Sequence, residues 1–496
     1  MLALAKKTKS KYLFEITTFV AGAIGMIIEL VASRILSPYL GSSNLIWTCI
    51  IGMMLAFMSL GYFIGGKISD KHPKRDILSL FLLNVAIFTS LIPILEINII
   101  EPLSKTKLDL AVIAIISSTL TFGIPSMFLA SASPFAVKLK EKDIEEIGQV
   151  SGKMSACSTA GSIIGTFLAG FFLIPKLGVK NIILLITIIL IILSFIVHEE
   201  KNIKYIIKTS IIALVLIAIV FIGKAAFFRA HKNIILDTDS QYSRIWIKKF
   251  KTKNGKEYNT LEVDLGVESI STGDNTLFSD YYLRYYDLFN YYKKDTTDVL
   301  LIGGAAYIYP TYFLEKYPDK QIDVVEIDPK MTELAQKYFG LDITKEKLKI
   351  YHQDGRRYLN TTNKKYDCIL IDAFKGINAP FQLTTKEALE NAKKDLKENG
   401  IIITNIVSAL EGDKSEFIKK EYATYQKVFK HVRIYQAQQG LFNDDEIQNL
   451  IIVGFKGDIE ENQETYETYK ELLQKELTQY KTKENYVTDD LCSIGI

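Results

Sequence analysis

Cysteine is rare in this sequence. The chain has four cysteines, and they stand far apart at Cys49, Cys157, Cys368 and Cys492. None belongs to a Cys-x-x-Cys pair, and no histidine stands at metal-ligand spacing from them. A disulfide framework needs paired cysteines, and a zinc site needs clustered Cys and His ligands. The sequence therefore predicts neither a disulfide framework nor a bound metal.

An excess of one charge is also missing. The chain has 59 Lys and Arg against 56 Asp and Glu, a formal net charge of +3. Proteins that bind nucleic acid through its phosphates have a basic patch, often interleaved with aromatic residues. The sequence shows no such patch, so no nucleic acid is expected as a partner.

Hydrophobic residues are abundant but unevenly distributed. They make up 48% of the chain, with a mean hydropathy of +0.14. Residues 12–222 are rich in Ile, Leu, Phe, Ala and Gly, whereas most charges and tyrosines follow residue 231. A length of 496 residues favours two or three domains. We predict a membrane domain over 1–230, a β-hairpin and aromatic helix region over 231–296, and an α/β domain over 297–496.

The first domain is predicted to be an all-α polytopic bundle in a lipid bilayer. A membrane span needs about 20 mostly apolar residues, and helices satisfy their own backbone polar groups. The segments that qualify are 12–36, 45–66, 77–100, 108–137, 155–174, 181–197 and 203–223. The fourth contains Pro125 and Pro134, which predict a kink or a break.

Loop charges predict the orientation of the spans. Fifteen basic residues stand before the first span and in every second loop after it, against four in the alternate loops. The positive-inside rule then places the amino terminus in the cytoplasm and, with seven spans, the carboxyl-terminal domain outside it. The basic loop GKISDKHPKR at 66–75 resembles the loop between the second and third helices of major facilitator transporters, which is cytoplasmic.

Two ionisable residues, Glu29 and Arg34, lie within the first span. Each costs about 2.5–3.5 kcal/mol on membrane-insertion scales. One interpretation is a polar pathway or ligand contact. The other, which we favour, is that Arg34 extends to the helix end while Glu29 pairs with a neighbouring helix. Glycine pairs at four-residue spacing predict close helix packing; they are Gly61 with Gly65 and Gly161 with Gly165.

The polar part of the chain alternates apolar runs with helical patterns, which predicts a parallel sheet with helices on its faces. The predicted strands are 298–304, 321–328, 347–354, 366–372 and 400–407, with 431–437 and 449–455 completing a seven-stranded sheet. A candidate hairpin precedes them, with strands at 242–250 and 258–265. This pattern is typical of a Rossmann-like α/β domain.

Polar and glycine residues follow three of these strands. Open α/β sheets bind ligands at the carboxyl ends of their strands. Gly303 and Gly304 allow close backbone approach to a ligand, and Glu326, about twenty residues on, can accept hydrogen bonds from two ribose hydroxyls. Asp354-Gly355 is placed to meet an adenine amino group. Together these residues predict a nucleoside site.

The runs LLIGGAAYIYPTYFLEKYPDKQIDVVEIDP, HQDGRRYL, YDCILIDAFKG and LTTKEAL resemble the spermidine-synthase-like domain of the class I methyltransferase fold. With the hydrophobic half, including GQVSGKMSACSTAGSIIGTFLAGFFLIPKLG at 148–178, the whole chain resembles the membrane-fused spermidine synthases. The resemblance implies a transferase of polyamine biosynthesis. Its donor would be decarboxylated S-adenosylmethionine or S-adenosylmethionine, and its acceptor a small amine.

The resemblance makes Asp372 the catalytic carboxylate at the end of the fourth strand. The sequence departs from the family pattern at three places. Ala305-Ala306 stands where the family has a glycine-rich loop that contains an acid. Lys375 stands where the family has a second carboxylate. Tyr282, followed by Leu283, stands where the family has a Tyr-His pair. Lys375 would repel a polyamine, so we expect an acceptor outside the standard polyamines. Tyr282 and Lys375 are candidate substrate residues, while the tyrosine-rich run 281–292 is interpreted mainly as core.

Three functions stay open. The first is the membrane-anchored transferase. The second is a transporter or membrane scaffold whose α/β domain binds a ligand without catalysis, and the third is a domain kept only for assembly. An intracellular donor requires the α/β domain to lie in the cytoplasm. The charge rule gives that location if segment 203–223 does not cross the membrane. A homo-oligomer is compatible with the sequence.

Overall fold

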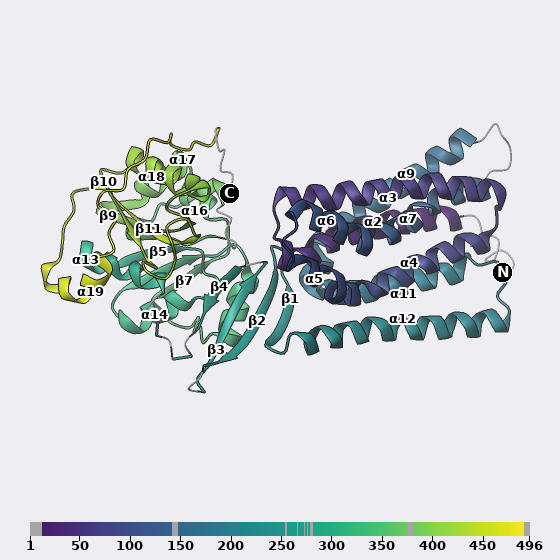
Figure 1. The fold of residues 1–496 in the computed structure, drawn as a ribbon, viewed down its shortest axis with the longest axis horizontal. Helices are drawn as coiled ribbons and strands as arrows, with labels where there is room; N and C mark the ends of the chain where they lie inside the picture. The colour runs from purple at the N-terminus through teal and green to yellow at the C-terminus, as the bar shows by residue number, and fades with distance from the viewer. Residues whose placement is uncertain are drawn as a thin grey trace. The chain divides into compact units, whose positions relative to one another are not determined.

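The computed structural model describes residues 12–140, 147–252, 255–264, 266–271, 273–274, 276–277, 281–374 and 380–490. The chain forms two compact units, Met1–Trp246 and Ile247–Ile496 (Figure 1). The first is helical and the second is built mainly on a β-sheet. Division of the chain at residues 230 and 296 stays a prediction.

Within the described residues, the helical unit contains seven segments long and apolar enough to cross a membrane. This confirms the predicted number of candidate spans, and seven such helices indicate an integral membrane protein. The segments are Leu13–Leu40 (α2), Asn44–Lys71 (α3), Arg75–Ser104 (α4 and α5), Leu110–Lys140 (α6 to α8), Ile147–Leu177 (α9 and α10), Val179–Val197 (α11) and Ile203–Ala230 (α12).

The fourth segment is interrupted, as its prolines predicted. Helix α6 (Leu110–Ser118) passes through a π-helical turn into α7 (Ile124–Ala130), and α8 (Ala132–Lys140) follows. Pro125 lies in the first turn of α7, where its missing N–H costs no helical hydrogen bond. Pro134 lies near the start of α8 in the same way.

The predicted glycine contacts are confirmed. Helix α9 (Ile147–Leu168) packs on α2, and α3 packs on α7. A Cβ atom at Gly161 would stand 1.9 Å from the Phe19 carbonyl oxygen, and one at Gly61 would stand 2.1 Å from that of Met127. The second glycine of each pair is similarly crowded, at Gly65 and Gly165. Backbone thus meets backbone at both helix pairs, which only glycine permits.

We predict that Gly161→Val destabilises the protein because the new side chain forces α2 and α9 apart. The loss should be about 1–3 kcal/mol or more. Gly152→Val is the matched control, because it lies on the same helix and a Cβ there meets nothing within 4 Å. Thermal unfolding of the purified proteins in detergent measures the difference. Equal midpoints for the two variants would contradict the packing described here.

A buried group of charges connects the first β-strands to the helices of the same unit. Strand β1 is Ile234–Asp239, and β2 is Arg244–Lys251. The Arg244 guanidinium is 2% exposed and donates to both carboxylate oxygens of Asp237, at 2.8 and 2.9 Å, and to Glu96 at 2.8 Å. Lys180 lies 2.6 Å from Asp237. Because each buried charge has a close opposite partner, this cluster is structural.

The second unit contains the predicted seven-stranded sheet. Its strands are β5 (Asp298–Ile302), β6 (Gln321–Val325), β7 (Leu348–Tyr351), β8 (Tyr366–Ile371), β9 (Leu396–Ser408), β10 (His431–Gln436) and β11 (Gln448–Phe455). Their order is β10-β11-β9-β8-β5-β6-β7, and β11 alone runs against its neighbours. The expected Rossmann-like fold is confirmed.

Helices cover this sheet on both faces. They are α13 (Phe289–Tyr292), α14 (Ile308–Lys316), α15 (Pro329–Tyr338), α16 (Gly355–Thr361), α17 (Lys386–Asp395), α18 (Glu416–Val428) and α19 (Tyr466–Leu473). In β5, Val299 and Leu301 belong to one hydrophobic core, and Leu300 and Ile302 belong to another. Side chains alternate along a strand, so β5 contributes to a core on each face.

A smaller sheet has the order β1-β2-β3-β4. Strand β3 is Glu257–Val263, and β4 is Gly266–Ile270. The hairpin predicted from the sequence corresponds to β2 and β3. The flanking strands β1 and β4 were not predicted.

Candidate functional site

The order of the large sheet reverses beside β5, which lies between β6 and β8. Ligands of such sheets bind outside the carboxyl ends of the strands at this reversal. The structure brings the ends of three strands together there. The Gly303 amide after β5 donates to the Val325 carbonyl of β6 at 2.9 Å, and the Asp372 amide after β8 donates to the Ile302 carbonyl at 2.8 Å.

Gly303 turns the chain directly against Asp372. Its φ is +97°, a conformation that favours glycine. A Cβ atom at this position would lie 1.9 Å from the Asp372 carbonyl oxygen. Glycine is therefore required here by the contact with the Asp372 backbone. Close approach of Gly303 to a ligand stays a prediction.

Glu326 holds the loop that follows Gly303. Its carboxylate is 7% exposed and accepts hydrogen bonds from the amides of Gly304 at 2.8 Å, Ala305 at 3.0 Å and Asp328 at 2.9 Å. Burial raises the pKa of the carboxyl group, while these amides act in the opposite direction. A carboxylate has about four acceptor positions. Three are taken, so the conformation leaves about one for a ribose hydroxyl.

Asp354 and Gly355 begin helix α16 beside the end of β5. The Asp354 carboxylate caps the helix by accepting the Arg357 amide at 2.8 Å. A Cβ atom at Gly355 would lie 2.5 Å from the side chain of Ile302. The two residues therefore lie at the strand ends as expected, and contact with an adenine stays a prediction.

Asp372 is half-buried, and each of its carboxylate oxygens has a donor. The Tyr282 hydroxyl donates at 2.8 Å, and the Asn405 side-chain amide donates at 3.1 Å. Asn449 in turn donates to the Asn405 oxygen at 3.0 Å. Burial raises the pKa of the Asp372 carboxyl, whereas the bonds from Tyr282 and Asn405 act against that rise. The result is an oriented carboxylate that takes up a proton more readily than one in water.

Sequence reasoning missed Asn405 and Asn449, which orient Asp372, and Ser269, whose hydroxyl accepts the Ala306 amide at 3.2 Å. One signal was available for Asn405. It is a polar residue inside the apolar run GIIITNIV of β9. Such a residue in a buried strand needs a hydrogen-bond partner.

The tyrosine-rich run 281–292 divides into two roles. Tyr285, Tyr286, Tyr291 and Tyr292 are at most 2% exposed and belong to one hydrophobic core, as expected. Tyr282 is 9% exposed and donates to Asp372. Its contact with an acceptor stays a prediction.

Two other expectations concern Lys375 and a metal. Lys375 lies outside the described residues. Within the described ranges there is no group of three or more His, Cys, Asp and Glu side chains that could hold a metal ion.

We predict that Tyr282→Phe raises the pKa of Asp372. The Tyr282 hydroxyl stabilises the ionised carboxylate, so its removal favours the protonated form and increases the protonated fraction at a given pH. Infrared difference spectroscopy between two pH values measures the carboxyl band, which Asp372→Asn identifies. Tyr285→Phe is the control, because no described residue pairs with the Tyr285 hydroxyl. An unchanged titration in Tyr282→Phe would show that the hydrogen bond is absent in solution.

Comparison with known proteins identifies a family that the α/β unit resembles. Residues 288–439 match the family model described as Spermine/spermidine synthase domain. That range contains Gly303, Glu326, Asp354, Asp372 and Asn405.

Two curated relatives illustrate the match. The polyamine aminopropyltransferase of Vibrio vulnificus is 34% identical over 134 residues, 26% of this chain and 43% of that protein. Polyamine aminopropyltransferase 2 of Aquifex aeolicus is 24% identical over 407 residues, 79% of this chain and 78% of that protein. The second match is too long to fit within Ile247–Ile496, so it includes part of the helical unit. The chain spans less than half the length of several other curated relatives.

Among solved structures, a probable spermidine synthase from Corynebacterium glutamicum is similar. It is 20% identical, with a TM-score of 0.42, and the match covers 51% of this chain and 96% of that protein.

Proposed function

Because residues 288–439 form a spermine/spermidine synthase domain behind seven long apolar helices, we propose that the chain is a membrane-anchored aminopropyltransferase. The donor substrate is decarboxylated S-adenosylmethionine, which supplies the aminopropyl group. The variant with S-adenosylmethionine as donor would transfer another carbon group from the sulfonium sulfur. The observation that carries the proposal is the oriented, half-buried carboxylate of Asp372 at the strand ends. Gly303 and Glu326 support it, because they form the loop that would meet the donor nucleoside.

The reaction needs a neutral amine beside the sulfonium carbon. The amine nitrogen attacks that carbon, a nitrogen–carbon bond forms, and the carbon–sulfur bond breaks. The electron pair of the broken bond leaves on sulfur as a neutral thioether, and the new ammonium loses one proton. Placement of two reactants in this geometry removes much of the entropic cost of their encounter.

Asp372 has two roles in this proposal. Its ionised form attracts and orients the amine, and its raised pKa lets it accept the proton that the nitrogen releases. Tyr282 and Asn405 are positioning residues, because they fix the direction of both carboxylate oxygens.

The acceptor need not be a standard polyamine. Ala305-Ala306 lacks the family's loop acid, and Lys375 adds a positive charge to the sequence where the family has a carboxylate. Ala305 has a left-handed backbone with φ of +45°, a conformation that favours glycine. Loss of the anionic contact that the resemblance implies favours a less cationic acceptor.

The intracellular donor places the α/β unit on the cytoplasmic side in this proposal. The charge rule with seven crossings gives the opposite side. Both are satisfied if the last apolar helix, Ile203–Ala230, does not cross the membrane.

We expect Asp372→Asn to lower kcat by about 10²–10⁴-fold, since the variant cannot accept a proton. The assay measures thioether release from the sulfonium donor with a panel of amines, using the full chain in detergent. The exposed Asp319→Asn is the matched control and should keep full activity. Turnover unaffected by Asp372→Asn would overturn the catalytic assignment. Donor binding by the wild-type chain without thioether release from any amine would favour the alternative of a binding unit.

We expect Glu326→Gln to weaken donor binding by about tenfold or more while kcat changes less. The variant loses the charge that attracts the ribose hydroxyls and the loop amides. Calorimetry of donor and thioether binding to the full chain tests this, with the exposed Glu333→Gln as control. Unfolding midpoints separate a loss of loop structure from a loss of contact. Equal affinity of Glu326→Gln and wild type would exclude Glu326 from the nucleoside site.

A further inference from the structure

A cavity of about 160 Å³ lies inside the helical unit, bounded by α2, α3, α7, α8 and α9. By this measure one water needs about 10–15 Å³, so a small organic ion fits. None of the described residues that line the cavity is Lys, Arg or His, and Glu29 of α2 is the one acid among them. The cavity therefore has negative character.

Glu29 does not pair with a neighbouring helix. Among the described residues its carboxylate has no hydrogen-bond or ion-pair partner, so the packing role favoured from the sequence is wrong. Arg34, in contrast to Glu29, has a partner, because its guanidinium donates to the Gln241 carbonyl at 2.7 Å. An ionisable group within an apolar helix that faces a cavity marks a ligand or ion site.

Hydroxyl groups complete the lining. Ser133, Ser158 and Thr159 come from α8 and α9, and no hydrogen bond from their side chains to other described residues is found. Their oxygens are free to accept a donor from a ligand. Tyr62 of α3 adds an aromatic ring, and aromatic faces attract organic cations.

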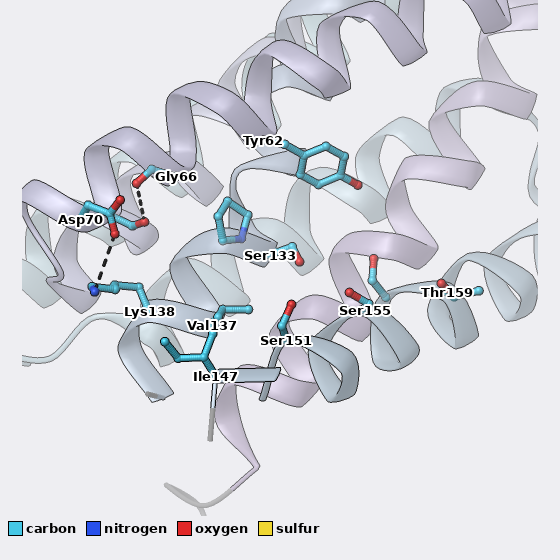
Figure 2. A pocket seen from close by; sticks show the side chains of 13 residues that line it. Tyr62, Gly66, Asp70, Ser133, Val137, Lys138, Ile147, Ser151, Ser155 and Thr159 are labelled. Atoms are coloured by element: carbon cyan, nitrogen blue, oxygen red, sulfur yellow. Dashed lines mark hydrogen bonds and ion pairs between the residues drawn. The ribbon is translucent and has the colours of Figure 1, made fainter. Parts of the chain in front are cut away.

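A wider cavity of about 590 Å³ adjoins the first. Tyr62, Ser133, Ser158 and Thr159 line both. Figure 2 shows the wider cavity between α3, which carries Tyr62 and Asp70, and the segments that carry Ser133 and Ser155.

At the end of the wider cavity Asp70 lies 3.7 Å from Lys138. The Asp70 side chain is 71% exposed. The wider cavity is therefore an approach to Glu29 from the end of α3 that carries Asp70.

We propose that the Glu29 cavity binds a primary alkylammonium ion. A carboxylate, unpaired hydroxyl oxygens and an aromatic ring match the charge, the three N–H donors and the apolar chain of such an ion. The choice of an amine over a metal cation rests on the proposed function, because amines are the acceptors and products of aminopropyl transfer. The site is distinct from the Asp372 site, since every residue that lines it belongs to Met1–Trp246.

The test uses the full chain in phosphatidylcholine nanodiscs, whose neutral lipid does not compete for amines. Binding of radiolabelled 1,4-diaminobutane is measured in an Asp372→Asn background. We expect Glu29→Gln to raise Kd about tenfold or more and Glu29→Asp to retain most of the affinity. Glu200→Gln, the same change in an exposed loop residue, is the matched control and should have no effect. The double change Ser158→Ala and Thr159→Ala should weaken binding severalfold, and it tests the site if Glu29→Gln does not fold.

Binding that is insensitive to Glu29→Gln and to the hydroxyl changes would overturn the proposal. Displacement of the amine by Na⁺ at equal concentration would also overturn the proposal, since the site would then bind any monovalent cation and not specifically an alkylammonium ion. The two proposals fail separately. Loss of turnover in Asp372→Asn with Glu29-dependent amine binding intact supports both, whereas wild-type binding without any turnover contradicts only the transferase.

Discussion

The backbone contact between Gly303 and Asp372 is the constraint on which the candidate site depends. A Cβ atom at Gly303 would lie 1.9 Å from the Asp372 carbonyl oxygen, so the turn after β5 and the end of β8 form one rigid junction. The amides of Gly303 and Asp372 both donate to carbonyls at strand ends, and these bonds fix the positions of the ends of β5, β6 and β8 relative to one another. In the proposed transferase, a donor that lies across Gly303 would be held close to Asp372, as transfer between two substrates requires.

The two carboxylates of the site differ in their partners, and this difference separates their roles. Glu326 accepts three backbone amides, two of which, from Gly304 and Ala305, belong to the loop after Gly303. Asp372 accepts two side-chain donors, Tyr282 and Asn405, which orient the group. In the proposed function, the group that shapes the loop suits the recognition of a nucleoside, and the group that side chains orient suits proton transfer.

The sequence predicted the elements well and their polar contacts poorly, for a physical reason. Hydrophobic periodicity is local, so seven apolar helices and seven strands could be found from the sequence, together with the glycine contacts of Gly61 and Gly161. Hydrogen bonds of the site join residues far apart in the chain. Tyr282 and Asp372 are 90 positions apart, and Asp372 and Asn405 are 33 apart. Strands β1 and β4 are short and at most partly apolar, and their pairing depends on β2 and β3, so periodicity alone did not indicate them.

Buried charge in the helical unit shows why Glu29 deserves a different interpretation from Arg244. Arg244 is surrounded by Asp237 and Glu96 at hydrogen-bond distance, so its burial is compensated within the protein and needs no ligand. Glu29 has no such partner among the described residues, yet it faces a cavity with free hydroxyl oxygens. A carboxylate in an apolar helix must be neutralised by a proton, hydrated, or paired with a cation from outside the chain. The cavity supplies the space for the last two, and the ammonium ion that we propose would be the pairing cation.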